Sequence, residues 1–107
     1  MIGLLTSPAS VSQTVNAIKS CIEGGLDYFW IEGEVSNLSN SAAGHYYFTL
    51  SDSNASLAVA LFRSDAFRNP AIKKVKDGDK IICYGKITFY DKRGTVQLLA
   101  QRIVNSG

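Results

Sequence analysis

The feature that most constrains the fold is a change of hydrophobic period after Leu26. From that point β-branched and aromatic residues alternate with polar ones in short runs, which are separated by polar or glycine-containing stretches. A period of two residues predicts β-strands with one buried and one exposed face. We predict strands over residues 28–35, 45–50, 56–63, 80–90 and 95–104. We predict connections over residues 37–44, 52–54, 64–76 and 91–94.

The long connection between the third and fourth strands limits the architectures that these strands can form. It contains Pro70 and is expected to hold only a short helical turn. The fourth run has an interior glycine, Gly85, which predicts a bend or bulge of the kind that lets a small barrel turn a corner. Five such strands favour an all-β fold, the five-stranded Greek-key barrel known as the OB-fold. An SH3-like barrel is the alternative.

An amphipathic helix is predicted before the strands. Four aliphatic residues from Val11 to Ile22 fall on one helical face, a serine on either side of Val11 can cap the start, and Gly24-Gly25 ends the pattern. We therefore expect one OB-fold domain over residues 10–104, with its amino-terminal helix over 11–23. Residues 1–9 are expected to form a loose segment and residues 105–107 a tail.

Composition is that of one ordinary soluble domain. The chain has 107 residues, of which 46% are hydrophobic and 19% charged. Its two cysteines, Cys21 and Cys83, form no CxxC motif, so neither a zinc site nor a disulfide framework is predicted. The longest apolar run, residues 57–62, is too short to span a membrane, and the first residues lack the basic start of a signal peptide. A cytoplasmic location without a cofactor is expected.

Charge is distributed unevenly along the chain. Residues 1–53 hold one basic and five acidic residues, whereas residues 54–107 hold ten basic and four acidic ones. This asymmetry is compatible with a basic patch that binds a polyanion, although surface lysines commonly serve only solvation. The lysines at 73, 74 and 76 are interpreted in that second way.

An OB-fold commonly binds single-stranded nucleic acid or oligosaccharide across strands two and three and the adjoining loops. A single strand requires cations for its phosphates and flat side chains on which bases stack. Tyr47 and Phe62 are predicted to face away from the core, so they are stacking candidates; alternatively, they pack under the helix or against another domain. The candidate phosphate ligands are Arg63, Arg68, Lys92 and Arg93. For the last two a solvated turn is the alternative.

The remaining polar candidates favour binding over catalysis. His45 is the only histidine, so no site with two imidazoles can form; it can donate to a phosphate or base edge or make a structural hydrogen bond. Glu32 and Glu34 share one face of a strand, but no third group is predicted to converge on them. Neither a catalytic nor a metal site is therefore predicted.

Several short motifs occur in series along the chain. They are VSQ at 11–13, WIEGEVSN at 30–37, GHYYFTL at 44–50, LFR at 61–63, GD at 78–79, Tyr90, RG at 93–94 and QL at 97–98. Each is weak alone, but their order and spacing resemble the amino-terminal OB-fold domain of the bacterial exodeoxyribonuclease VII large subunit. The resemblance extends over about residues 10–104.

This resemblance implies a module that presents single-stranded DNA to a nuclease domain absent from this chain. The parent enzyme of the family degrades single strands from either end, and a divalent metal can serve it. Its catalytic region and the helices that gather small subunits lie after this domain, so the chain alone is expected to bind rather than cleave. The DNA contacts that the resemblance implies are His45, Tyr47, Phe62, Arg63 and Arg93.

Two positions depart from the family pattern and put the strength of DNA binding in question. Ala58 stands where the family usually has a basic residue, and Val96 where it has an aromatic one. Both changes remove groups that can touch a strand. These two residues therefore favour a lower affinity for DNA, or a mainly architectural role for the domain.

Three functions are compatible with these residues. The first is a single-stranded DNA-binding module, as described above. The second is an assembly element that packs on the rest of its subunit or on another copy through an apolar patch of Phe62, Ile82 and Tyr84. The third is a small nuclease in which Glu32, Glu34 or Asp52 holds a divalent metal.

Overall fold

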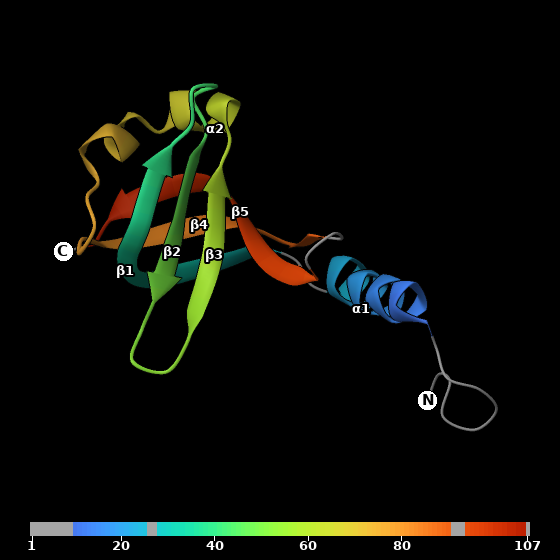
Figure 1. Ribbon diagram of the computed structural model, residues 1–107. Helices are drawn as coiled ribbons and strands as arrows, with labels where there is room; N and C mark the ends of the chain where they lie inside the picture. The colour runs from blue at the N-terminus through green and yellow to red at the C-terminus, as the bar shows by residue number, and fades with distance from the viewer. Residues whose placement is uncertain (1–9, 26–27, 91–93, 107) are drawn as a thin grey trace.

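The computed structural model describes residues 10–25, 28–90 and 94–106. An α-helix, α1 (Val11–Gly25), precedes the strands, which are β1 (Tyr28–Asn40), β2 (Tyr46–Ser51), β3 (Ser56–Leu61), β4 (Lys80–Tyr90) and β5 (Thr95–Asn105). Between β3 and β4 lie a short helix, α2 (Arg63–Arg68), and a 3-10 helix, η1 (Pro70–Lys74). Figure 1 shows the strands wrapped into a barrel, with α2 and η1 at one end and α1 outside it.

The strands close into a barrel in the order β1-β2-β3-β5-β4. β1 pairs antiparallel with both β2 and β4, and the circle is completed by the parallel pairing of β3 with β5. The five-stranded closed barrel predicted from the alternating runs is therefore confirmed. Closure leaves each strand with two neighbours, which removes exposed sheet edges.

The barrel core is made by the alternate, inward-facing residues of the strands. Phe48 of β2 pairs with Val59 of β3, and both are buried together with Leu50 and Leu61. Ile72 of η1 is buried with them and belongs to the same cluster. Burial of these aliphatic and aromatic side chains is the main force that holds the barrel together.

β1 is longer than the sequence predicted. Its pairing with β2 shifts between Ser36 and Ser39 and then continues to Asn40, so the predicted loop over 37–44 is wrong for its first four residues. The irregularity lies at Asn37, which has a φ of 54°. Asparagine tolerates this left-handed conformation, so a polar stretch that lacks alternation still continues the strand.

Other element boundaries differ less. α1 extends to Gly25 rather than ending at 23, and β5 extends to Asn105, which pairs with Ile81. The third strand ends at Leu61 rather than 63, because Phe62 and Arg63 begin the turn into α2. The predicted segment at 1–9 lies outside the described residues.

The strand pairing is irregular at Gly85, where the sequence predicted a bend or bulge, and the extra residue lies in β5. The pairing of β4 with β5 shifts between Tyr84 and Gly85, so that Gln101 has no direct partner. A Cβ atom at Gly85 would lie 2.1 Å from the carbonyl oxygen of Leu99, a distance that no real side chain tolerates. Glycine is therefore required for the close approach of the two strands.

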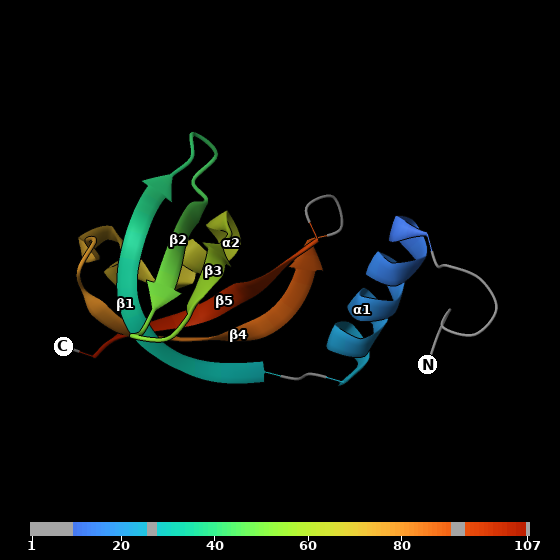
Figure 2. The same cartoon turned by 60° about the horizontal axis from the view of Figure 1, so that its bottom comes forward.

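α1 begins with a capping box and lies beside β4. Ser10 Oγ accepts a hydrogen bond from the Gln13 backbone N–H at 3.0 Å, and Gln13 Oε1 accepts one from the Ser10 N–H at 2.9 Å. Figure 2 shows α1 next to the far ends of β4 and β5. Ile22 packs against the core cluster, whereas Val11 and Ile18 of the predicted apolar stripe are exposed. In the described ranges, no helix is long and apolar enough to cross a membrane.

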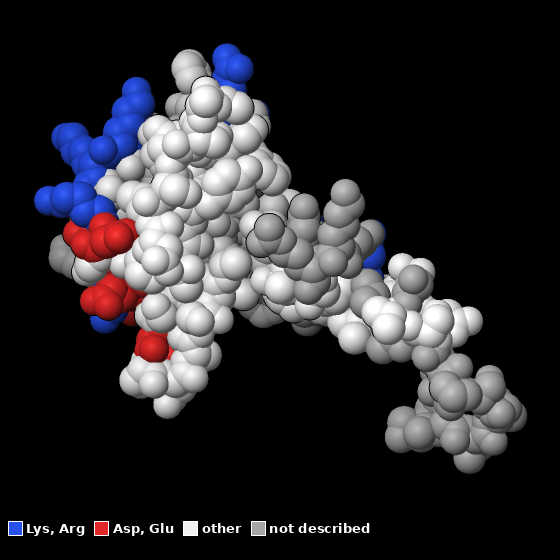
Figure 3. Space-filling view, viewed as in Figure 1, with Lys and Arg blue, Asp and Glu red and all other residues white. Residues whose placement is uncertain are grey.

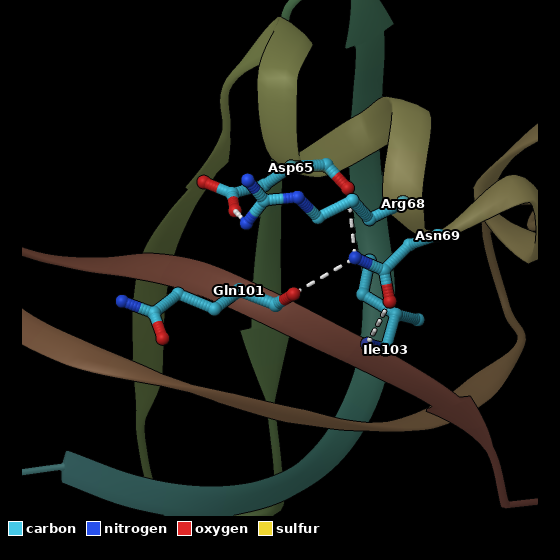
Figure 4. A network of polar contacts seen from close by, with 5 residues as sticks. All are labelled: Asp65, Arg68, Asn69, Gln101 and Ile103. Atoms are coloured by element: carbon cyan, nitrogen blue, oxygen red, sulfur yellow. Dashed lines mark hydrogen bonds and ion pairs between the residues drawn. The ribbon is translucent and has the colours of Figure 1, made fainter.

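The side chain of Asn69 fixes the α2–η1 segment to the barrel (Figure 4). Its Nδ2 donates to the carbonyl oxygens of Asp65 and Gln101 at 2.7 and 2.8 Å, and its Oδ1 accepts from the Ile103 N–H at 3.0 Å. One amide therefore caps α2 and also satisfies backbone groups of β5 next to the bulge. This connection determines where α2, and with it Arg63, sits.

Candidate nucleic-acid interface

Tyr47 and Phe62 lie on the outer surface, where β2 begins and β3 ends. Tyr47 alternates with the buried Phe48 and is 38% exposed, and Phe62 follows the buried Leu61 and is 39% exposed. α1 contacts β4, so it is not the element that covers these two rings. The predicted orientation of both aromatic side chains is thus confirmed.

His45 joins the two rings into one group. Its imidazole lies edge-on to Phe62, with ring centroids 5.3 Å apart, and edge-on to Tyr47, with centroids 6.4 Å apart. The backbone N–H of Arg63 donates to His45 Nδ1 at 2.9 Å. The β1–β2 loop and the start of α2 are therefore connected through this one side chain.

This hydrogen bond selects the tautomer of the neutral imidazole. Because Nδ1 accepts a hydrogen bond from the Arg63 amide, the ring proton is carried by Nε2. Nε2 is then the atom that can donate to a phosphate or base. The two alternatives for His45, a structural hydrogen bond and a ligand contact, are compatible with each other because they use different ring nitrogens.

The loop between β1 and β2 is shaped to bring His45 close to Arg63. Ser41 and His45 are joined by a backbone hydrogen bond of 2.8 Å, and Ser41 Oγ accepts from the His45 N–H at 3.1 Å. Gly44 has a φ of 89°, a conformation that favours glycine, and it lies next to the Arg63 side chain. We name the group His45, Tyr47, Phe62 and Arg63 the β2–β3 site.

A cavity of about 400 Å³ adjoins the β2–β3 site. It lies between the β1–β2 loop and the α2–η1 segment, and Arg63, Phe67 and Lys73 are among its lining residues. The Phe67 side chain is 88% exposed. Sequence reasoning missed Phe67 and treated Lys73 as a solvated lysine, because neither lies on a strand whose alternation could show its direction.

The other predicted phosphate ligands do not join this group in the same way. Arg68 forms an ion pair with Asp65 at 3.8 Å and lines a different depression together with Gln101 and Arg102. Its charge is therefore partly compensated by a carboxylate. Lys92 and Arg93 lie outside the described residues.

Positive charge flanks the sheet rather than lining it. Figure 3 shows Lys and Arg side chains gathered at the edge beside η1 and at the top of the barrel, while the front surface of β1–β3 is uncharged over most of its area. Lys73 and Lys74 belong to the last turn of η1. The basic and acidic side chains seen in this view therefore lie at the borders of a largely uncharged surface.

The positions that depart from the family pattern are neutral in the structure. Ala58 is exposed on the outer face of β3, opposite Thr49, and Val96 is 38% exposed near the start of β5. Ala60, which alternates with the buried Val59 and Leu61, is itself buried because it lies between Tyr47 of β2 and Leu99 of β5. Small and apolar residues here are consistent with the uncharged front surface.

The carboxylates considered for metal binding lie around one depression but do not converge on a common point. Glu32, Glu34 and Asp52 border one shallow depression together with Lys80, which pairs with Glu32 at 3.9 Å. Within residues 10–25, 28–90 and 94–106, no cluster of three His, Cys, Asp or Glu side chains that could hold an ion is found. Hydrogen bonds from the Asn54 and Ala55 N–H groups lower the pKa of Asp52, which stabilises its charged form in the β2–β3 turn.

Comparison with known proteins supports the interpretation of the barrel. Residues 9–104 match the family described as OB-fold nucleic acid binding domain. The chain is 39% identical over 98 residues to the exodeoxyribonuclease 7 large subunit of Legionella pneumophila, and 44% identical over 94 residues to that of Neisseria meningitidis serogroup B. These alignments cover 92% and 88% of this chain. The resemblance found in the motifs is confirmed.

The matched relatives are much longer than this chain. The chain spans about a fifth of their length, 22% for the Legionella subunit and 20% for the Neisseria subunit. A similar solved structure is that of the Schizosaccharomyces pombe Stn1-Ten1 complex, with a TM-score of 0.63 and 21% identity. That alignment covers 74% of this chain and 57% of the other and shows a shared fold.

Proposed function

Because this chain belongs to the family of OB-fold nucleic acid binding domains, we propose that it binds single-stranded DNA and presents it to the nuclease region of an exodeoxyribonuclease VII large subunit. The observation that carries this proposal is the β2–β3 site. There two exposed rings and the His45 imidazole lie together, and the backbone of Arg63 is hydrogen-bonded to that imidazole. These are the groups that a flexible single strand requires.

Each residue has a separate role in the proposed complex. Tyr47 and Phe62 offer ring faces to unpaired bases, and Nε2 of His45 donates to a phosphate or base edge. Arg63 pairs with a phosphate, and it is positioned by its backbone hydrogen bond to His45. Stacking accepts every base, so little sequence preference is expected.

The catalytic region and the contacts with small subunits are assigned to polypeptide beyond these 107 residues. This chain then acts as a binding module without catalysis or a cofactor of its own, in the cytoplasm of a bacterium. Arg68 and the turn residues Lys92 and Arg93 are proposed as additional phosphate contacts. Relatives that carry the nuclease name are about five times longer, which is consistent with this division of roles.

The test is fluorescence anisotropy with labelled oligothymidine and a duplex of the same length. We expect preference for the single strand and weaker binding when salt rises from about 50 to 200 mM, because neutralised phosphates release counterions. Tyr47→Ala should weaken binding about 5- to 150-fold, the equivalent of one lost stack of roughly 1–3 kcal/mol. Tyr47→Phe retains the ring and should bind nearly as well.

Arg63→Ala tests the electrostatic part. It should weaken binding about tenfold and reduce the slope of log K against log salt by about 0.7, the value for one phosphate of a single strand. Lys74→Ala removes the same charge from η1 and serves as the matched control. Equal losses in Arg63→Ala and Lys74→Ala would contradict a defined site.

Failure of the wild-type chain to bind would favour the assembly function. In that case sedimentation should show self-association that single-stranded DNA does not alter. The apolar patch expected for that function, Phe62, Ile82 and Tyr84, is divided between two groups of rings, because Phe62 contacts His45 whereas Tyr84 contacts Trp30.

A further inference from the structure

A second group of aromatic rings lies on the outer surface of β1 and β4. Tyr28 and Tyr84 are stacked, with centroids 5.4 Å apart and planes 12° from parallel. Trp30 lies against Tyr84 at 4.8 Å with a tilt of 44°. Trp30 is 59% exposed and Tyr28 45% exposed. We name these three residues the β1–β4 aromatic face.

Strand pairing explains how these rings come together. Trp30 pairs directly with Tyr84, and Tyr28 is two residues before Trp30, so all three side chains project from the same side of the sheet. The flanking β4 residue Cys83 is buried on the opposite side, in the core. The rings are thus held by the sheet itself and need no further element to order them.

Each tyrosine of this face has a cationic neighbour on the adjacent strand. Lys86 of β4 pairs with Tyr28, and Arg102 of β5 pairs with Tyr84; both cations are exposed. The bulge at Gly85 determines that Arg102, rather than Gln101, is opposite Tyr84. Each of these two tyrosines therefore has a cation beside it on the next strand.

The acidic group nearest along β1 is already engaged. Glu32 pairs with Lys80 at 3.9 Å and accepts a hydrogen bond from the Ser106 hydroxyl. It compensates neither Lys86 nor Arg102 in the structure. The charge available beside the aromatic rings is therefore positive.

We propose that the β1–β4 aromatic face is a second binding surface for single-stranded nucleic acid, on which a base stacks against Trp30 and phosphates pair with Lys86 and Arg102. This inference rests on the proposed function and extends it from the β2–β3 site to another face of the barrel. A covering protein surface that is merely apolar would bury the two cations without partners, which is unfavourable. A single strand supplies both a flat apolar ring and an anion for each cation.

The test uses Trp30 itself as the reporter, since it is the only tryptophan of the chain. Unlabelled oligothymidine of about 20 nucleotides, longer than the roughly 4–16 that one OB-fold covers, is added to the wild-type chain. A base stacked on the indole should quench its emission. The quenching should saturate over the same concentration range as the anisotropy change of the labelled oligothymidine, and it should reverse at high salt.

Variants show whether the cations contribute. Lys86→Ala and Arg102→Ala should each weaken binding about three- to tenfold and reduce the salt slope by about 0.7. Lys74→Ala is the control for loss of one positive charge elsewhere. Trp30→Phe keeps a ring and should bind within about threefold of wild type, whereas Trp30→Ala should lose about tenfold. Circular dichroism checks that each variant is folded.

The outcomes separate this inference from the proposed function. Tight binding that depends on Tyr47 and Arg63 but leaves Trp30 emission unchanged would overturn the second surface and retain the first. An emission change that follows protein concentration without DNA would assign the aromatic face to self-association and also overturn the inference. Absence of any DNA binding would overturn both.

Discussion

Substitution of Asn69 tests how the structure positions the start of α2. Asn69→Ala removes three hydrogen bonds at once, those to the Asp65 and Gln101 carbonyls and that from the Ile103 N–H (Figure 4). Two of the three are partly buried, so water replaces them only incompletely. The Asp65 and Gln101 carbonyl oxygens and the Ile103 N–H would then lose the partners that the Asn69 side chain supplies.

The expected loss follows from these bonds. Each contributes about 1 kcal/mol net, and the exposed bond to Gln101 contributes about half of that, so the free energy of unfolding should fall by about 2–3 kcal/mol. For a domain of this size such a loss lowers Tm by roughly 10 °C. It is also a large part of the stability of a typical domain, about 5–15 kcal/mol.

Urea unfolding followed by circular dichroism measures the change. Asn54→Ala, in the exposed β2–β3 turn, is the control and should shift the free energy of unfolding by less than about 0.5 kcal/mol. Asn69→Asp keeps the acceptor for Ile103 but loses both donated bonds, so it should be no more stable than Asn69→Ala. An unchanged urea midpoint in Asn69→Ala would refute the idea that this amide fixes α2 to the barrel.

Three further predictions concern a glycine, a thiol and a carboxylate. Gly85→Ala should lower the free energy of unfolding, measured in urea, by about 3 kcal/mol, because its Cβ would lie 2.1 Å from the carbonyl oxygen of Leu99 in β5. The control Gly24→Ala, whose Cβ would meet no atom within 4 Å, should leave the free energy of unfolding unchanged or raise it slightly. Burial raises the pKa of Cys83 to about 12, so a thiol reagent near pH 8 should modify only the exposed Cys21 until denaturant is added. Because the thiol of Cys83 ionises at lower pH in the unfolded chain than in the folded one, the free energy of unfolding should fall as pH rises from about 9 to 12. Modification of two thiols in the folded chain would contradict this burial. The Asn54 and Ala55 N–H groups lower the pKa of Asp52, so the charged carboxylate should stabilise the fold above the ordinary carboxyl pKa and lose this effect as pH falls through the lowered pKa. NMR titration of Asp52 should show the lowered pKa. Asp52→Asn should remove this part of the loss of stability in acid.

The alternating pattern was sufficient to predict the strands and the direction of most side chains. Tyr47 and Phe62 each adjoin a buried residue in a run of period two, and that local rule placed both outside the core. Gly85 likewise indicated a bulge, because a glycine inside a long strand weakens it unless the backbone bends or a neighbouring strand comes close. In each case the structural consequence depends on residues next to one another in the chain.

Contacts between distant residues could not be obtained in this way. The link from His45 to the Arg63 amide spans 18 residues, and the bonds of Asn69 to β5 span 32 and 34. The β1–β4 aromatic face depends on strand register, which pairs Trp30 with Tyr84. Alternation tells which side of a strand a residue occupies, but not which residue of another strand lies opposite.

The sequence by itself therefore determined the set of elements and the inward or outward direction of their side chains, since both follow from hydrophobic period and turn-forming residues. Tertiary structure alone decided which outward residues of different segments are neighbours: Phe62 with His45 on one surface, and Trp30 with Tyr84 on another. The physical reason is that barrel closure and the bulge at Gly85 fix the strand register through backbone hydrogen bonds and core packing. Those interactions join segments that no local pattern relates.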